Sequence, residues 1–237
     1  YGETWTWDGE RWELLTAAGP PRMGVALVHD PLRKRVIAHA GYDDAGPVTD
    51  TWQLVGSTWT QIAVDGPPIL LMNLAFDRTH DQIIGFGGYD MDVTGETWRL
   101  DGATWTRMSP ATSPPPRARA AMAYDAARGS VVMVGGFRGY TAANRYLEDA
   151  WEWNGTDWRP RPSIDPFHAR AAPGGFYDPI ARAFTLVGGT QLFPLDDVWR
   201  LSVSPIGTAG EERCRGALLD DDGDGAAGCD DPDCWGR

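Results

Sequence analysis

The chain of 237 residues carries 33 acidic and 21 basic side chains, which give it a formal net charge of −12 at pH 7. This excess of acidic groups argues against a nucleic acid or an anionic membrane surface as the natural partner, because such surfaces attract basic proteins. No apolar run approaches the ~20 residues that a membrane-spanning helix needs. Length and composition fit one main domain with a sizeable core, followed by an appendage.

The first predicted element is a hairpin of two short strands around Trp5 and Trp12, with Asp8-Gly9 as its turn. Its pattern is an acidic residue, a variable residue and a Trp, with a second Trp seven positions after the first. The pattern occurs in four copies, which contain the pairs Trp5 and Trp12, Trp52 and Trp59, Trp98 and Trp105, and Trp151 and Trp158. A fifth copy begins at Trp199 and lacks the second Trp. In the fourth copy Asn154-Gly155 predicts a type I′ turn, since both residues tolerate a positive φ.

A second pair of strands is predicted between successive copies. A Pro-rich turn, often with an Arg, leads into an apolar strand that ends at an Asp, and a further apolar strand then ends in a pair of small residues. The four acidic positions are Asp30, Asp77, Asp125 and Asp178, and the four pairs are Ala40-Gly41, Gly87-Gly88, Gly135-Gly136 and Gly188-Gly189. Each period of 46–53 residues therefore holds four predicted strands, the number in one blade of a β-propeller.

The glycine pair, the variable loop, the acidic residue and the two spaced Trp residues together resemble the kelch-repeat family over residues 1–203. The resemblance implies an all-β, kelch-type propeller. Strand counting gives a lone pair, three sets of four and a final set of three, so we expect about five blades or part-blades. They would form an arc of a larger ring or a five-bladed ring with two incomplete blades. We expect the Trp rings to fill the wedges between sheets. Because the sequence opens inside a Trp hairpin, we also expect a piece of a longer chain or surface assembly.

The loops after the four pairs should emerge on one face of such a propeller, where recognition commonly resides. Each loop contains an aromatic residue, and several contain charged residues. We expect the residue directly after each pair to pack locally, and the residues deeper in the loops to be free for a partner. The candidate ligand-binding residues are Tyr42, Asp43, Tyr89, Asp92, Arg138, Tyr140 and Phe193, with Phe137 and Tyr146 as further aromatic residues of the same loops.

The sequence contains no recognisable catalytic motif. Its four His residues, His29, His39, His80 and His168, have no metal-binding spacing. Residues 1–203 contain no Cys, which the Cys–Tyr cofactor of kelch-like copper oxidases requires. We therefore expect a non-catalytic scaffold for binding or adhesion that recognises a protein or a glycan. Two alternatives stay open: a carbohydrate-active or oxidoreductase enzyme whose acidic residues converge in space, and a purely structural module of a larger surface protein.

A change of composition follows a linker at 204–210. Within residues 211–237 the sequence Asp220-Asp221-Asp222-Gly223-Asp224-Gly225 has the spacing of a calcium loop. Its predicted ligands are Asp220, Asp222, Asp224, the carbonyl of Ala226, and Asp231 at the twelfth position. All three Cys residues of the chain lie here, which indicates one local disulfide and an oxidising compartment. The segment also resembles a Cys- and Asp-rich motif of secreted myxobacterial proteins. We expect a secreted or cell-surface protein that binds calcium through this tail.

Overall fold

The computed structural model describes residues 2–140, 145–161 and 168–202. Chain contacts divide the molecule into two units, Tyr1–Leu201 and Ser202–Arg237, and the sheets belong to the first. Over the described residues the chain is all-β, with 17 strands and no helix. The predicted fold class and strand order are therefore confirmed.

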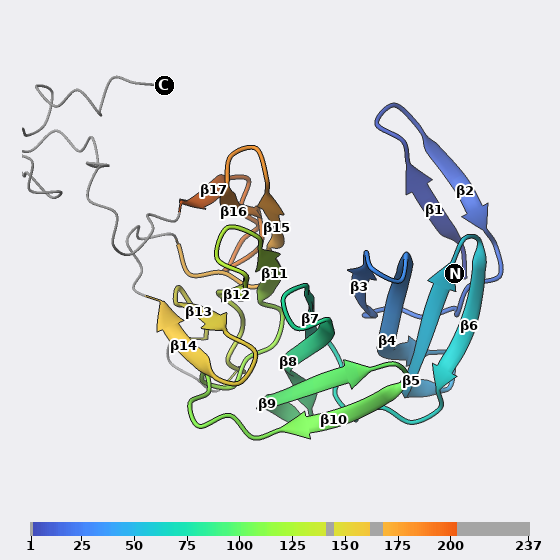
Figure 1. Ribbon diagram of the computed structural model, residues 1–237, viewed down its shortest axis with the longest axis horizontal. Coiled ribbons are helices and arrows are strands. Elements are labelled where there is room, and N and C mark those ends of the chain that lie inside the picture. The colour runs from blue at the N-terminus through green and yellow to red at the C-terminus, as the bar shows by residue number, and fades with distance from the viewer. Residues whose placement is uncertain (1, 141–144, 162–167, 203–237) are drawn as a thin grey trace, which may run out of the picture. The chain divides into compact units, whose positions relative to one another are not determined.

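The strands form five antiparallel sheets, and within each sheet neighbours in the sequence pair with one another (Figure 1). The first sheet is the hairpin of β1 (Thr4–Trp7) and β2 (Trp12–Thr16). The three complete sheets consist of β3 (Ala26–Asp30), β4 (Arg35–Asp43), β5 (Gly46–Val55) and β6 (Thr58–Ala63); β7 (Asn73–Asp77), β8 (Gln82–Asp90), β9 (Asp92–Asp101) and β10 (Thr104–Met108); and β11 (Ala121–Asp125), β12 (Ser130–Val134), β13 (Ala150–Trp153) and β14 (Trp158–Arg161). The last sheet has three strands, β15 (Gly174–Asp178), β16 (Ala183–Val187) and β17 (Val198–Ser202).

Four of the sheets are arranged like the blades of a β-propeller. The first strand of each is the inner one, so β3, β7, β11 and β15 contact each other in sequence order. Three apolar clusters fill the spaces between successive sheets. Ile37 and Phe76 belong to the first, Phe86 and Met133 to the second, and Val132 and Phe184 to the third. The hydrophobic core is thus distributed between the blades, as the packing of sheet on sheet requires.

The second Trp of a copy reaches across to the preceding sheet. The indole Nε1–H donates to a Thr hydroxyl there, from Trp59 to Thr4 at 2.8 Å, from Trp105 to Thr51 at 2.9 Å and from Trp158 to Thr97 at 3.0 Å. Trp158 is completely buried in its cluster, as expected from the repeat. These bonds hold each blade to its predecessor.

The expectation of buried Trp rings is wrong for the first hairpin. Trp5 is 47% exposed and Trp12 is 64% exposed. Trp12 is equivalent to Trp59, Trp105 and Trp158, which bond to the preceding sheet, and among the described residues no sheet precedes this hairpin. The predicted type I′ turn at Asn154-Gly155 is also wrong. Residues 154–157 form a four-residue loop in which Gly155 alone has a positive φ (100°), and the Asn154 carboxamide oxygen accepts the N–H groups of Thr156 and Asp157 at 3.0 and 2.9 Å.

The Asp at the end of each inner strand shapes the hairpin that follows it. Its carboxylate accepts backbone N–H groups two or three residues later, as an Asx turn does. The four residues that act in this way are Asp30, Asp77, Asp125 and Asp178. Four positions after each Asp the backbone adopts a positive φ, for example 50° at Asp81 and 67° at Gly129. The repeated Asp is thus a turn-forming residue in every blade.

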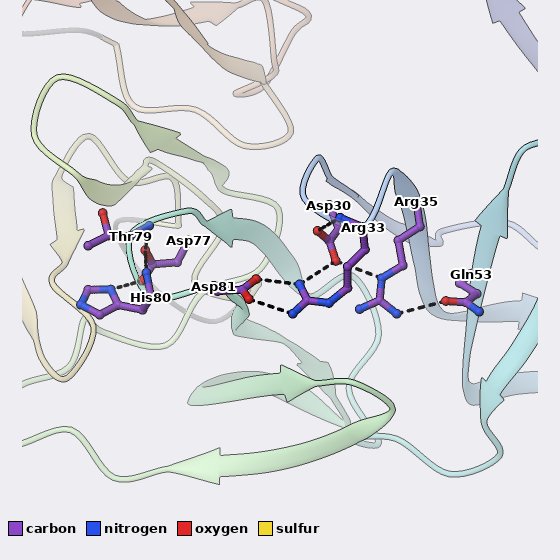
Figure 2. A network of polar contacts seen from close by, with 8 residues as sticks. All are labelled: Asp30, Arg33, Arg35, Gln53, Asp77, Thr79, His80 and Asp81. Atoms are coloured by element: carbon purple, nitrogen blue, oxygen red, sulfur yellow. Dashed lines mark hydrogen bonds and ion pairs between the residues drawn. The ribbon is translucent and has the colours of Figure 1, made fainter.

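A polar network joins these turns between the first two complete sheets (Figure 2). Arg33 donates to Asp81 of the neighbouring sheet at 2.6 and 2.9 Å, and to Asp30 of its own at 3.2 Å. Arg35 binds the buried Asp30 at 2.9 Å and Gln53 at 3.0 Å. Burial by itself raises the pKa of Asp30, but the N–H of Arg33 and the two guanidinium groups outweigh it and hold the pKa below its ordinary value. This network lies at the end of the hairpins opposite to the glycine pairs.

Candidate ligand-binding pocket

Each glycine pair gives its strand a sharp change of direction. Gly87 and Gly88 have φ values of 60° and 112°, which side chains rarely permit. A Cβ atom on Gly87 would also overlap the carbonyl oxygen of Arg117, which belongs to the next blade. In the first complete sheet Ala40 stands at the equivalent place and adopts the same left-handed conformation, with a φ of 56°. The backbone geometry is therefore retained even where the glycine is not.

An Arg from the Pro-rich turn fixes the pair in three of the four blades. Its guanidinium forms a bidentate ion pair with the acidic residue of the acid-x-Trp pattern, which we call the Arg–Asp clasp. The clasps are Arg22–Asp50 at 2.5 and 3.1 Å, Arg117–Asp149 at 2.6 and 2.8 Å, and Arg170–Asp197 at 2.6 and 2.9 Å. Each Arg also donates to the carbonyl of the first residue of the pair, for example to Gly135 at 3.0 Å and to Gly188 at 2.8 Å. The clasp thereby anchors the base of the loop.

The acidic residue of the clasp has a second donor. Asp149 accepts the indole N–H of Trp151 at 2.8 Å in addition to its bonds from Arg117. Burial raises the pKa of Asp149, and the hydrogen bonds and charge of Arg117 more than compensate, so the pKa lies below its ordinary value. The blade of β7–β10 differs, since Ile69 replaces the Arg and Glu96 binds Arg107 at 2.7 Å instead. The acid-to-Trp bond persists there, from Trp98 at 2.9 Å.

The residue after each pair forms a backbone bridge with a residue just before the inner strand of the same blade. Backbone bridges join Met23 to Tyr42, Leu70 to Tyr89, Ala118 to Phe137, and Ala171 to Thr190. The positions are equivalent in all four blades, and three of the four carry an aromatic ring. Neighbouring blades are held in register here by backbone bonds such as Gly88 N–H to the Arg117 carbonyl at 2.8 Å. The repeat thus brings four separate loops to one place.

A pocket of about 630 Å³ lies where these positions meet. Its aromatic lining consists of Tyr42, Tyr89, Phe137, Tyr140 and Tyr146. The ring of Phe137 meets the edge of Tyr140, with centroids 4.9 Å apart, and lies 6.0 Å from Tyr146. Thr190 and Arg119 add polar groups to the lining. A concave site with an apolar wall and few polar groups has the usual construction of a binding pocket for a small ligand.

Residues with unusual backbone angles lie directly after the four bridges. Gly24, Leu71, Arg119 and Ala172 follow the four bridges, and their φ values are 68°, 53°, 56° and 52°. Gly24, Leu71 and Arg119 line the pocket, and all four also line a second cavity of about 370 Å³ along the starts of the inner strands. A left-handed conformation costs a residue with a side chain on the order of 1–2 kcal/mol. Such outliers gather at functional sites more often than elsewhere.

The structure divides the candidate residues predicted from the sequence into two groups. Tyr42, Tyr89 and Tyr140 line the pocket, together with the other two loop aromatics, Phe137 and Tyr146. The remaining four, Asp43, Asp92, Arg138 and Phe193, are not among its lining residues. Asp43 instead accepts the N–H groups of Ala45 and Gly46 within its own turn, at 2.8 and 3.1 Å.

The sequence did not identify the four residues that follow the bridges. Gly24, Leu71, Arg119 and Ala172 differ completely in chemistry, so no repeated residue type marks their position. The signal that would have found them is their constant placement, two residues after the position of the clasp Arg. Alignment of the four copies by structure shows that correspondence directly.

The proposed metal ligands Asp220, Asp222, Asp224, Ala226 and Asp231 lie outside the described residues, as do the three Cys. Within the described ranges, no group of three or more His, Cys, Asp or Glu side chains could hold a metal ion. The same part of the chain has no helix of the length and apolar character needed to cross a membrane. Comparison of the chain with protein-family models and with curated proteins gives no match.

Proposed function

We propose that this protein is a non-catalytic binding module of the kelch-propeller type, secreted or displayed at a cell surface, that holds a glycan in the aromatic pocket. The observation that carries the proposal is the convergence of equivalent loops. Tyr42, Tyr89 and Phe137 occupy one repeated position on three blades, and all three rings line a single pocket. A packing role alone does not call for an open cavity at that place.

The chemistry of the lining suits a sugar. The C–H face of a pyranose is apolar and packs on an aromatic ring, while its hydroxyl groups bond to tyrosine hydroxyls and to water. Tyr140 is 76% exposed and Tyr42 is 37% exposed, so both have free surface to offer. An extended peptide would instead be expected to pair with an open strand edge. Here the backbone groups of Tyr42 and Tyr89 are already paired with Met23 and Leu70.

A binding role fits this lining better than hydrolysis does. Glycosidases commonly use two carboxylates that flank the bond to be cleaved. Among the described residues, none that lines the pocket is an Asp, Glu or His. The tail adds a separate proposal, a calcium site formed by Asp220, Asp222, Asp224, Ala226 and Asp231, which the ligand spacing supports. Calcium and the Cys residues both favour an extracellular location.

The test is a glycan array probed with the intact chain and two variants. Tyr140→Ala removes an exposed ring of the pocket, and Phe193→Ala removes an equally exposed ring (77%) that does not line it. We expect wild type and Phe193→Ala to bind the same glycans, and Tyr140→Ala to lose at least about tenfold in affinity, as the loss of one stacking ring implies. Binding of a protein partner in place of any glycan would overturn the glycan assignment. Equal losses in the two variants would overturn the assignment to this pocket.

A further inference from the structure

Arg119 is the one charged residue among the described residues that line the aromatic pocket. Its equivalents in the other blades, Gly24, Leu71 and Ala172, are all uncharged. The cation is therefore not part of the repeat that builds the blades. It is a feature of a single blade, placed at the position where the four blades meet.

The three Arg residues of the clasps are neutralised by carboxylates. Arg117, only two positions earlier, is completely buried and makes a bidentate pair with Asp149, and Arg22 and Arg170 are bound in the same way. Arg119 is exposed and makes no side-chain hydrogen bond or ion pair within the described ranges. A guanidinium has five N–H donors in a planar fork that matches a carboxylate. At Arg119 these donors are available to a ligand.

The backbone at Arg119 has the left-handed conformation that recurs at this position in all four blades. Its φ is 56°, a conformation that glycine adopts freely, and Gly24 occupies the equivalent position in the first complete sheet. An exposed side chain contributes little burial to offset that strain. Leu71 and Ala172 share the conformation, so what distinguishes Arg119 from its equivalents is its exposed charge.

We propose that the sugar held in the aromatic pocket is acidic, with its carboxylate bound by the guanidinium of Arg119. The inference rests on the proposed glycan-binding function and names the class of ligand. The net charge of the protein restricts the class of ligand further. A net charge of −12, with Asp43 and Asp90 in the neighbouring loops, disfavours a polyanion through long-range repulsion. The ligand is therefore a mostly neutral glycan with a single uronic acid unit that enters the pocket.

The experiment compares two probes that differ only in that charge. One is aldotriouronic acid, a xylobiose bearing one glucuronic acid, and the other is its methyl ester. Calorimetric titration of the intact protein should show the acid binding at least about tenfold more tightly than the ester, since charged hydrogen bonds are markedly stronger than neutral ones. Raising the salt concentration should narrow the difference.

Two substitutions at Arg119 make the test specific. Arg119→Gln should bind acid and ester alike. Arg119→Gly should do the same while being more resistant to urea than the wild type, because glycine relieves the positive φ, and a loss of preference in a more stable protein cannot be ascribed to unfolding. Arg78→Gln, at an exposed Arg in the turn after β7 that does not line the pocket, is the matched control and should retain the preference for the acid.

The outcomes distinguish a failure of this inference from a failure of the proposed glycan-binding function. If the wild type binds acid and ester equally, or if Arg119→Gln retains the preference, the inference fails while the glycan-binding function stands. If neither probe binds at millimolar concentration, the inference fails, and the glycan-binding function fails with it only if the glycan array also shows no binding. Loss of both probes in Tyr140→Ala, with the charge preference lost only in the Arg119 variants, would support both.

Discussion

The Arg–Asp clasp should respond very differently to the loss of its two members. In the Arg117–Asp149 pair the Arg side chain is completely buried, whereas the Asp side chain is 38% exposed. Asp149→Ala therefore leaves a buried cation with only two backbone carbonyls, those of Pro115 and Gly135, as acceptors. Removal of one partner from a buried ion pair typically costs about 3–5 kcal/mol of unfolding free energy.

Arg117→Ile should cost less. It removes the buried charge and leaves an Asp149 that water reaches and that still accepts the Trp151 indole N–H at 2.8 Å. The protein contains its own precedent, because Ile69 occupies this position in the blade of β7–β10 and is 2% exposed. We expect a loss of about 1–2 kcal/mol, from the hydrogen bonds removed. The double variant, with both Arg117→Ile and Asp149→Ala, should be more stable than Asp149→Ala alone, because it contains no buried unpaired cation.

The assay is reversible urea unfolding at pH 7, monitored by Trp fluorescence, with comparison of midpoints at a common slope. The predicted order of stability is wild type, then Arg117→Ile, then Asp149→Ala. An Arg117→Ile variant as destabilised as Asp149→Ala would contradict this order. Equality would mean that the guanidinium stabilises chiefly through its own packing and backbone bonds, and that the buried charge needs no counter-ion.

Three further predictions concern acid, backbone strain and calcium. Burial of His39 lowers its pKa from 6.5 to about 4, so the unfolded chain binds this proton more readily than the folded chain does. The contribution to the free energy of unfolding should be complete above pH 6.5 and fall by up to about 3 kcal/mol as the pH drops to 4. Urea titrations should show a smaller loss in His39→Gln and an unchanged loss in a variant of the exposed His29. Ala40→Gly should stabilise by about 0.5–1 kcal/mol, because it relieves a φ of 56°, and a destabilisation would show that the Ala40 methyl packs favourably enough to offset the strain. Calcium should raise the melting temperature of the intact chain but not of one truncated at Pro205, and an equal response of both would move the metal out of the tail.

The repeat made the fold predictable from the sequence. Trp52, Trp98 and Trp151 recur with their acidic neighbours, and alternation of apolar residues around them gives the strand order that the structure shows. The strands are local features, so local patterns suffice. The exposure of Trp5 could not be predicted in the same way, because burial of a ring depends on the neighbouring sheet that packs against it.

The sequence predicted residues of the candidate pocket only where equivalent loops of the repeat carry the same type of side chain. Tyr42 and Tyr89 were candidates because each loop after a pair of small residues contains an aromatic residue, although their repeated position favoured local packing. Arg119 was not predicted because its equivalents are Gly24, Leu71 and Ala172, and no residue type connects them. Its significance depends on the meeting of four blades and on the absence of a counter-ion among the described residues, and both are properties of the tertiary structure.

A crystal structure of the intact protein soaked with aldotriouronic acid, at ten times its measured Kd, would show where the sugar binds. We expect sugar rings against Tyr89 and Tyr140 and a carboxylate within hydrogen-bonding distance of the Arg119 guanidinium. A sugar bound on another surface, or an aromatic pocket without sugar at that concentration, would contradict this expectation.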